Sequence, residues 1–245
     1  MSSANVIEIF SSVQGEGKYL GCRQIFVRLA DCNLNCAYCD TDFRRADFCR
    51  IETFAGSATF RDVKNPLDAA QVAEVVKKFS DAVPTQAVSF TGGEPLLYWE
   101  FVRDVATAVK NFGVKIFLET NGTLYREFEK ISGVVDTVSA DIKLPGVVGR
   151  NLFDVHEKFL RAAQDKDLYV KIVVTGETTR EEFLSAVELV ANVDAEILLI
   201  LQPVTPVKGI GAVSAEKILS LQAAALRRLK NVRVIPQTHK FINVL

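Results

Sequence analysis

Short apolar runs rich in β-branched residues recur along the chain, and amphipathic segments separate them. Runs of this kind are typical of buried strands, whereas the intervening segments repeat apolar positions about every three to four residues, as helices do. Strands are predicted at Val6–Phe10, Gln24–Leu29, Ala87–Phe90, Lys115–Leu118, Thr137–Ala140, Leu168–Val174, Glu196–Leu201 and Val232–Ile235. Helices are predicted at Asp68–Ser80, Trp99–Phe112, Leu124–Ile131, Phe153–Gln164, Arg180–Ala191 and Ser214–Leu229.

This alternation of strand and helix predicts an α/β fold with a parallel sheet. The strand–helix units are too few for a closed barrel of the usual eight, so we predict a partial (β/α)6-type barrel of parallel strands, open at one side. The stretch 42–65 breaks the alternation and is expected to be an insertion or lid, or else a plain surface excursion. Because no repeat or linker divides the sequence, residues 1–245 are expected to form a single domain.

Polar segments rich in glycine and proline follow one predicted strand after another. They read TGGEP (91–95), ETNG (119–122), DIKLPG (141–146), TGE (175–177), QPV (202–204) and PQTHK (236–240). The carboxyl ends of parallel strands gather on one face of the fold, where ligands bind. These segments therefore predict a large shared pocket.

The composition limits the kinds of partner. The 245 residues are 49% hydrophobic and 24% charged, with a net charge of -1, so a sizeable core is expected and nucleic acid is not an expected partner. The first residues lack the order of a signal peptide, and no apolar run is long enough to cross a bilayer. We expect a cytoplasmic protein with no membrane partner that acts on a small molecule.

Three of the five cysteines fall in the segment CNLNCAYCDT (32–41), spaced C-x3-C-x2-C. In a reducing compartment they are poor disulfide candidates, and their spacing suits one metal centre. Zinc would need a fourth ligand or a water, whereas a 4Fe-4S cluster would keep one iron open. Both histidines lie far downstream and no second C-x2-C follows, which favours iron. Cys22 remains a candidate fourth ligand, and a group of buried thiols is the plain alternative.

The cysteine spacing after the strand QIFVRLA, followed by TGGEP, resembles the radical S-adenosylmethionine superfamily. The resemblance implies that Cys32, Cys36 and Cys39 hold a 4Fe-4S cluster whose open iron binds S-adenosylmethionine. Tyr38 resembles the aromatic residue that abuts the adenine, and the turn 92–94 resembles the one contacting the methionine amino group. Glycine in that turn would let the backbone approach the cofactor closely.

Three further segments narrow the resemblance: SSVQGEG (11–17), CDT (39–41) and the terminal PQTHK. Together they resemble the 7-carboxy-7-deazaguanine synthase family over nearly the whole chain. The resemblance implies conversion of 6-carboxy-5,6,7,8-tetrahydropterin to 7-carboxy-7-deazaguanine with loss of ammonia, in queuosine or archaeosine biosynthesis. It implies hydrogen abstraction at C6, regeneration of S-adenosylmethionine and a response to Mg²⁺. It also implies an electron donor such as flavodoxin or ferredoxin, and a homodimer.

The residues expected to bind the pterin come from four segments. A pterin edge carries donors and acceptors that polar side chains and backbone can match. Arg28 alternates against apolar neighbours and is expected to take the substrate carboxylate, although a solvated surface arginine is the alternative. The tail residues are expected to close over the substrate or to pack against the barrel. The expected set is Gln14, Gly15, Glu16, Arg28, Thr91, Gln237 and His239.

Other residues are expected on the cofactor side. The family pattern known to us is Ser-Pro-Lys, but this chain has Ser-Ala-Asp-Ile-Lys (139–143), so the role of Ser139 is better supported than that of Lys143. An ion pair between Asp141 and Lys143 is the alternative. Thr41 is expected to bind Mg²⁺, with Asp40 as its competitor or as a turn cap. The expected cofactor set is Tyr38, Gly93, Glu94, Glu119, Asn121, Ser139, Asp141, Lys143 and Gln202.

Two other functions stay open at this point. One is a different radical enzyme, such as an activase that takes a hydrogen from a glycine of a partner protein. The other is a zinc-holding binding module without chemistry. No residue is an evident general base, which agrees with radical chemistry, where the cofactor performs the hard step.

Overall fold

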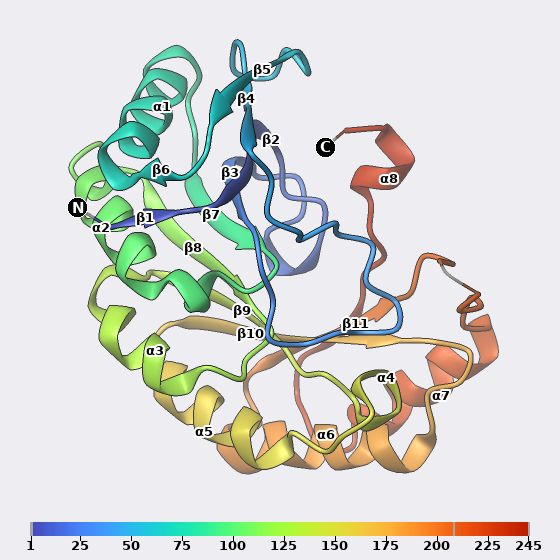
Figure 1. Ribbon diagram of the computed structural model, residues 1–245. Coiled ribbons are helices and arrows are strands. Elements are labelled where there is room, and N and C mark those ends of the chain that lie inside the picture. Colours follow the sequence, from blue (N-terminus) through green and yellow to red (C-terminus); the bar gives the residue numbers. More distant parts are fainter. Residues whose placement is uncertain (1, 208, 245) are drawn as a thin grey trace.

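The computed structural model describes residues 2–207 and 209–244 and is built around one large sheet (Figure 1). The ten strands of this sheet lie in the order β12-β11-β10-β9-β8-β7-β3-β2-β4-β5. The strands from β3 to β12 pair in parallel with their neighbours. They are β3 (Arg23–Leu29), β7 (Ala87–Gly92), β8 (Lys115–Thr120), β9 (Thr137–Asp141), β10 (Asp167–Val174), β11 (Leu198–Pro203) and β12 (Val232–Val234). Because β12 and β5 do not pair with each other, the barrel is open, and the predicted α/β partial barrel is confirmed.

Helices cover the outer, convex face of the sheet (Figure 1). Side-chain caps fix where two of them begin: Asp68 and Gln71 form a capping box on α1, and Thr179 and Glu182 form one on α6. The long helices are α1 (Ala69–Ala82), α2 (Trp99–Lys110), α3 (Tyr125–Ile131), α5 (Phe153–Ala163), α6 (Arg180–Val193) and α7 (Ala215–Ala225). The short ones are η1 (Gly17–Tyr19), η2 (Pro95–Tyr98), η3 (Ser132–Val134), α4 (Pro145–Val148) and α8 (His239–Ile242). Within the described chain, no helix combines the length and apolar character that a membrane crossing would require.

The inner face of the sheet changes character along its strands. Near the amino ends it is apolar, since Phe117, Tyr169 and Ile200 form a small buried cluster there. Side chains of one strand alternate between faces, so the next inward positions lie two residues further on. Those positions are polar: Glu119 follows Phe117, and Lys171 follows Tyr169. The open barrel therefore has an apolar floor below a polar cavity.

The stretch 42–65 extends the sheet. It contains the antiparallel hairpin β4 (Phe48–Glu52) and β5 (Phe60–Lys64), and β4 pairs in parallel with β2 (Val6–Val13). β2 in turn is antiparallel to β3. The two-residue strands β1 (Ser3–Ala4) and β6 (Leu67–Asp68) pair beside it. The hairpin thus lies at the edge of the sheet, and only Asp42 and Phe43 of this stretch line the cavity described below.

Candidate active site

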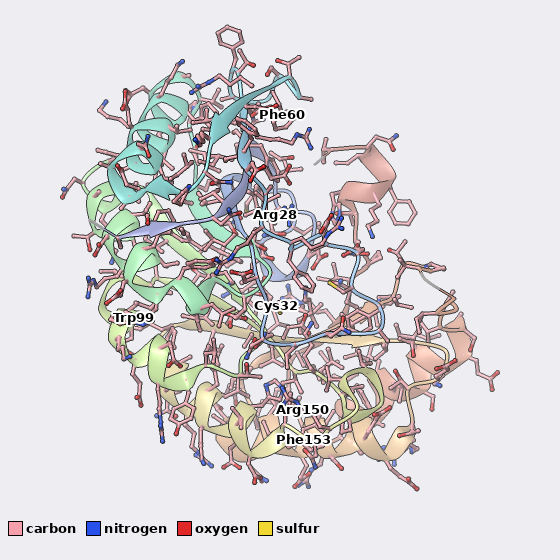
Figure 2. All side chains as sticks on the ribbon, in the orientation of Figure 1. Arg28, Cys32, Phe60, Trp99, Arg150 and Phe153 are labelled. Carbon is pink, nitrogen blue, oxygen red and sulfur yellow. The ribbon has the colours of Figure 1, made fainter. Side chains whose placement is uncertain are left out.

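A cavity of about 500 Å³ opens at the carboxyl ends of the parallel strands. Its volume falls in the usual range for small-molecule sites. Of the residues predicted to bind substrate, cofactor or metal, all line this cavity except Glu94. Figure 2 shows Arg28 and Cys32 toward the interior, whereas Trp99 and Phe153 lie on the outside of the fold.

One of the predicted loops does not contribute. The segment TGE (175–177) after β10 is absent from the cavity wall, contrary to our expectation that it shares the pocket. Its Thr175 N–H donates to Thr178 Oγ1 at 2.9 Å, and the two residues form a turn that leads into the cap of α6. β10 lines the cavity instead through Lys171 and Val173, which point inward from the strand itself.

The cysteine segment lies across the cavity as a loop after β3. Cys32, Cys36 and Cys39 are half-buried thiols in its wall. The Cys39 N–H donates to the Cys36 carbonyl at 3.0 Å, which closes a turn between the last two cysteines. Burial raises the pKa of Cys36 to about 11. A metal must therefore displace its proton on binding, as metal–thiolate sites generally require.

The donor set fits a three-cysteine iron–sulfur cluster. The two other cysteines, Cys22 and Cys49, do not line the cavity, so neither is placed to complete a four-cysteine set. Among residues 2–207 and 209–244, no three His, Cys, Asp or Glu side chains converge as a single metal ion needs. In a 4Fe-4S cluster each cysteine binds a different iron, so separated thiols suit it better than they suit one zinc ion.

The glycines after β7 are required by contact with the cysteine loop. The Gly93 N–H donates to the Leu29 carbonyl at 3.0 Å, and a Cβ at Gly93 would lie 1.7 Å from the Asp31 carbonyl oxygen. Gly92 has a φ of 120°, which L side chains rarely adopt. We expected glycine here so that the backbone could approach the cofactor. The structure adds a second reason, because the neighbouring backbone leaves no room for a side chain at these positions.

Glu94 lies behind the cavity wall. Its carboxylate accepts hydrogen bonds from the Leu96 N–H at 3.1 Å, the Thr120 hydroxyl at 2.9 Å and the Asn121 N–H at 2.7 Å. Complete burial raises the pKa of Glu94 to about 7, although these hydrogen bonds oppose the shift. The residue ties the loop after β7 to the loop after β8, and its predicted contact with the cofactor stays a prediction.

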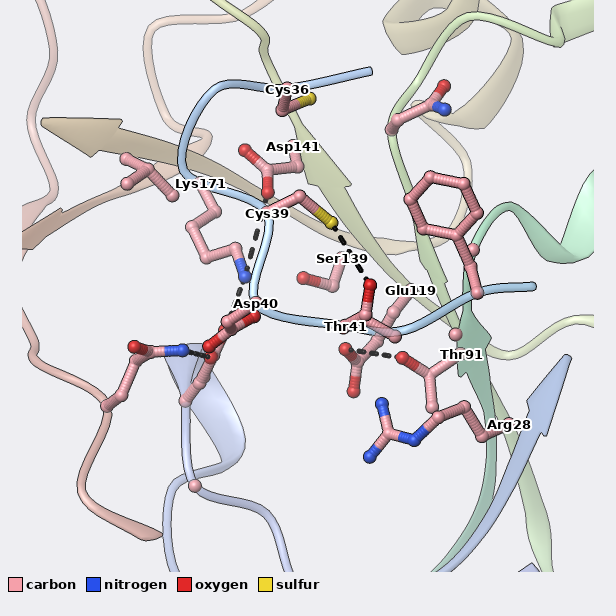
Figure 3. Close-up of a pocket in the computed structure, with 18 of the residues that line it drawn as sticks. Arg28, Cys36, Cys39, Asp40, Thr41, Thr91, Glu119, Ser139, Asp141 and Lys171 are labelled. Atoms are coloured by element: carbon pink, nitrogen blue, oxygen red, sulfur yellow. Dashed lines mark hydrogen bonds and ion pairs between the residues drawn. The ribbon is translucent and has the colours of Figure 1, made fainter. Parts of the chain in front are cut away.

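One hydrogen-bonded group joins residues from three segments: the loop after β2, strand β7 and strand β8. Glu119 accepts from Gln14 Nε2 at 2.9 Å and from the Ser89 hydroxyl at 3.2 Å. It also accepts from the Thr91 hydroxyl at 3.1 Å (Figure 3). Gln14 and Thr91 are in the predicted substrate set, whereas Glu119 is in the predicted cofactor set. The structure therefore places Glu119 among the residues expected to bind the pterin.

Arg28 belongs to the cavity wall. Its Nε donates to Glu8 Oε1 at 2.8 Å, and its guanidinium lies 5.7 Å from the centre of the Phe10 ring. Phe10 stacks on Phe26 at 5.1 Å, which gives the arginine an apolar base. Sequence reasoning missed Glu8, since nothing in its local pattern points to Arg28.

A second charged group lies on the opposite wall. Lys143 Nζ is 2.7 Å from Asp141 Oδ2 and 3.4 Å from the Tyr38 hydroxyl, so the ion pair considered as an alternative is present inside the cavity. Lys171 pairs with Glu16 and lies 3.7 Å from Asp141 (Figure 3). Sequence reasoning missed Lys171, although a lysine at an inward position of DLYVKIVV was a usable signal.

Two buried acceptors in the wall have no protein partner in the described chain. They are Asp141 Oδ1 and Gln202 Oε1, and both residues line the cavity. A buried acceptor without a hydrogen bond costs free energy, about 1–3 kcal/mol. Ligand donors at these two positions would remove that cost.

His156 joins two loops of the site from behind. Its Nε2 accepts from the Lys143 N–H at 3.2 Å, and its Nδ1 donates to the Gly122 carbonyl at 3.1 Å. Burial lowers the pKa of His156 to about 4, so the ring is neutral at pH 7. The sequence places His156 in a helix and gives no sign of either contact.

The tail after β12 lies along the mouth of the cavity. The Thr238 N–H donates to the Gly15 carbonyl at 2.9 Å, and Gln237 Nε2 donates to Glu16 Oε1 at 2.8 Å. Lys240 Nζ lies 2.6 Å from Asp40 Oδ2 and lowers the pKa of Asp40 despite its partial burial. The tail therefore holds both the QGEG segment and the end of the cysteine loop.

Comparison with known proteins agrees with this geometry. Residues 27–194 match the radical SAM superfamily. The chain is 39% identical to a 7-carboxy-7-deazaguanine synthase from Geobacter sulfurreducens, over 99% of this chain and 98% of that protein. It is 34% identical to one from Methanocaldococcus jannaschii, over 97% of this chain and 99% of that protein.

Among solved structures, QueE from Escherichia coli has the same fold. The TM-score is 0.65 at 21% identity, with 97% of this chain and 95% of that chain covered. The predicted family is confirmed, and both the activase and the zinc module lose their support. The chain therefore belongs to the radical SAM superfamily and, within it, to the 7-carboxy-7-deazaguanine synthase family.

Proposed function

We propose that this chain converts 6-carboxy-5,6,7,8-tetrahydropterin to 7-carboxy-7-deazaguanine with loss of ammonia, within 7-deazapurine biosynthesis. One observation carries the proposal: the three-cysteine loop and the polar wall built on Gln14, Glu16 and Arg28 open onto the same cavity. A radical made at the cysteine loop would therefore form within reach of a substrate held on that wall. The relatives named as this synthase supply the reaction.

Membership in the radical SAM superfamily implies a 4Fe-4S cluster and S-adenosylmethionine. Cys32, Cys36 and Cys39 would hold the cluster, in agreement with the donor set described above. When bound and reduced, these groups supply hydrogen-atom abstraction, so the protein needs no general base for that step. The chain's own residues bind, orient and shield the reactants.

On the cofactor side, polar groups line the wall from β8 to β11. Tyr38 offers an aromatic face, and the buried acceptors of Asp141 and Gln202 can receive the donors of a bound amine or ribose. Lys143 can neutralise a carboxylate while it pairs with Asp141. The remaining proposed contacts are Gly93, Asn121 and Ser139, and Glu94 would support Asn121 from behind the wall by accepting from its N–H.

On the substrate side, Arg28 is proposed to take the pterin carboxylate. Its fork geometry allows bidentate pairing, and its Nε already has a partner in Glu8, which leaves the terminal nitrogens for a ligand. Gln14, Gly15, Glu16 and Thr91, together with Glu119 that is hydrogen-bonded to two of them, would match the ring's donors and acceptors. Gln237 and His239, in the tail across the mouth, would exclude water.

We propose that Mg²⁺ binds at Thr41. The side chain lines the cavity beside the cysteines, and a hydroxyl together with a substrate carboxylate and waters suits a hard cation. Asp40 is the weaker choice, because its carboxylate is already paired with Lys240. Activity should fall on treatment with a chelator that leaves the cluster intact and should return with Mg²⁺.

A one-electron donor such as flavodoxin or ferredoxin would reduce the cluster, and the homodimer stays a prediction from the family resemblance.

The test of the proposed function uses anaerobically reconstituted, reduced protein with S-adenosylmethionine and the carboxylated pterin. Mass spectrometry should detect 7-carboxy-7-deazaguanine and an equal amount of ammonia. Absence of the deazapurine, from protein that still cleaves S-adenosylmethionine, would mean that this radical enzyme acts on another substrate.

A further inference from the structure

Lys171 is a buried lysine in the cavity wall, and the proposed function gives it no role. It lies on β10, where its Cα is the register partner of Asp141 on β9, and its side chain is only 11% exposed. Its ammonium contacts the Glu16 carboxylate and lies 3.7 Å from Asp141 Oδ2 (Figure 3). One cation therefore stands between the segment proposed to bind the pterin and the strand proposed to bind S-adenosylmethionine.

The two carboxylates depend on Lys171 to different degrees. Asp141 has a closer cation, because Lys143 Nζ lies 2.7 Å from the same oxygen. Glu16 has no second cation among its hydrogen-bond partners in the described chain, since its other oxygen accepts from the neutral Gln237 Nε2 at 2.8 Å. Removal of the Lys171 charge would therefore affect Glu16 much more than Asp141.

The charge on Glu16 depends on this contact. Burial alone would raise the pKa of Glu16, but the attraction and the hydrogen bond of Lys171 outweigh it and bring the pKa down to about 2, with help from Gln237 and His239. The other carboxylates near Lys171 are Asp141 and Glu119, which would disfavour a second buried negative charge if the lysine were absent.

We propose that Lys171 is a positioning residue for the pterin: it holds the Glu16 carboxylate ionised and aimed into the cavity as a fixed acceptor. The inference rests on the proposed function, because a pterin edge presents an amino group beside a ring N–H, and a carboxylate can accept from both. Each carboxylate oxygen of Glu16 keeps a second acceptor site after its bond to Lys171 or Gln237. Lys171 itself acts through Glu16 and does not touch the substrate.

The test is equilibrium binding to the anaerobic holoenzyme, without reduction, so that no turnover occurs. Titration calorimetry measures the affinity for 7-carboxy-7-deazaguanine, which carries the same amino and ring N–H donors as the pterin. The affinity for S-adenosylmethionine is measured separately. Lys171→Met should lower the affinity for the deazapurine by about 10- to 100-fold, the usual effect of removing a charge-assisted hydrogen bond. The affinity for S-adenosylmethionine should change by less than about threefold, and Lys171→Arg should restore most of the deazapurine affinity.

The matched control is Lys230→Met, which removes a lysine ion pair with Glu196 far from the cavity and should leave both affinities unchanged. Glu16→Gln and the double variant with Lys171→Met complete a cycle. Because the lysine acts through Glu16, the double variant should bind within about twofold of Glu16→Gln alone. Should Lys171→Met fail to fold, Lys171→Gln, which keeps a donor without charge, should show an intermediate loss.

Several results would overturn the role of Lys171. One is that Lys171→Met or Lys171→Gln binds the deazapurine with wild-type affinity. Another is that either variant loses as much affinity for S-adenosylmethionine as for the deazapurine. The third is that the losses of Lys171→Met and Glu16→Gln add up in the double variant. A different result would overturn the proposed function and this role with it: wild-type holoenzyme that binds S-adenosylmethionine but no deazapurine. The two failures are distinguished by whether the wild-type protein binds the deazapurine.

Discussion

A single methyl group at Gly15 should release the tail from the mouth of the cavity. A Cβ at this position would lie 2.1 Å from His239 Nδ1 and 2.6 Å from His239 Cβ. Because the histidine Cβ is tied to the backbone, a rotation of the ring cannot relieve the overlap. In Gly15→Ala the tail must therefore move away, although Gly15 has no unusual φ that would strain an alanine.

Four polar interactions hold the tail against the QGEG segment and the cysteine loop, and their strength sets the size of the effect. The Gly15 carbonyl accepts from the Thr238 N–H at 2.9 Å and from the Thr238 hydroxyl at 3.1 Å. The other two are the Gln237 to Glu16 bond at 2.8 Å and the Lys240 to Asp40 pair at 2.6 Å. The three hydrogen bonds contribute about 1 kcal/mol each, and the exposed ion pair contributes little. The docking equilibrium of the tail should weaken by about 2–3 kcal/mol, which is a factor of about 30 to 150.

Hydrogen exchange measured by mass spectrometry on the tail peptide tests this directly. The Thr238 amide should exchange about 30- to 150-fold faster in Gly15→Ala, while the core strands keep their protection. The control is Gly133→Ala, where a Cβ meets no atom within 4 Å. Wild-type exchange at Thr238 in Gly15→Ala would refute the reasoning, because the tail would then dock without this close packing.

Three further predictions concern the loops behind the site. Cys36→Ala should abolish the broad visible absorption of the reconstituted cluster, whereas the change of buried Cys49 to alanine should retain it. Glu94→Gln should lower the melting temperature by about 2–10 °C in a thermal scan, because an amide cannot accept from all three donors that the carboxylate serves. Since the pKa of His156 is about 4 when folded and about 6.5 when unfolded, the unfolded chain binds the extra proton between these values. The free energy of unfolding should thus fall as the pH drops from 6.5 to 4, by up to about 3 kcal/mol. Urea unfolding at several pH values should show a weaker pH dependence of this free energy in His156→Gln than in the wild type, and an equal pH dependence would contradict the assignment.

The strands were predictable because both faces of a parallel sheet are buried, so each central strand is a continuous apolar run. The carboxyl ends of β3 and β10 were predicted correctly, but those of several other strands were placed too early. β7 runs on to Gly92 where the apolar pattern ends at Phe90, and β8 runs on to Thr120 where it ends at Leu118. These last strand residues are polar because they face the cavity. Periodicity therefore missed the part of the sheet that carries the site.

The hairpin β4–β5 was not recognised, and its composition explains why. β5 lies at the edge of the sheet and is largely exposed, so FRDVK contains no apolar run. β4 has the short alternation FCRIE, which is too brief to distinguish from a loop. Such strands are fixed by their partners in the sheet, which the local sequence does not reveal.

The residues that line the cavity were largely found from their position after strands and from the family resemblance. Their supporting partners were not found. Lys171 and Glu16 are 155 positions apart, and His156 acts through backbone groups of other loops. Such pairs leave no local pattern, because only the fold brings them together. Glu94 was instead predicted to contact the cofactor, but the structure places it behind the cavity wall, where it supports the loop after β8.

The most direct test of the central claim is turnover with limiting S-adenosylmethionine. Reduced, reconstituted protein with Mg²⁺ and excess carboxylated tetrahydropterin should release more 7-carboxy-7-deazaguanine than the S-adenosylmethionine supplied, because the cofactor is regenerated. Accumulation of 5'-deoxyadenosine without any deazapurine would contradict the claim that the cysteine loop and the polar wall serve one reaction in one cavity.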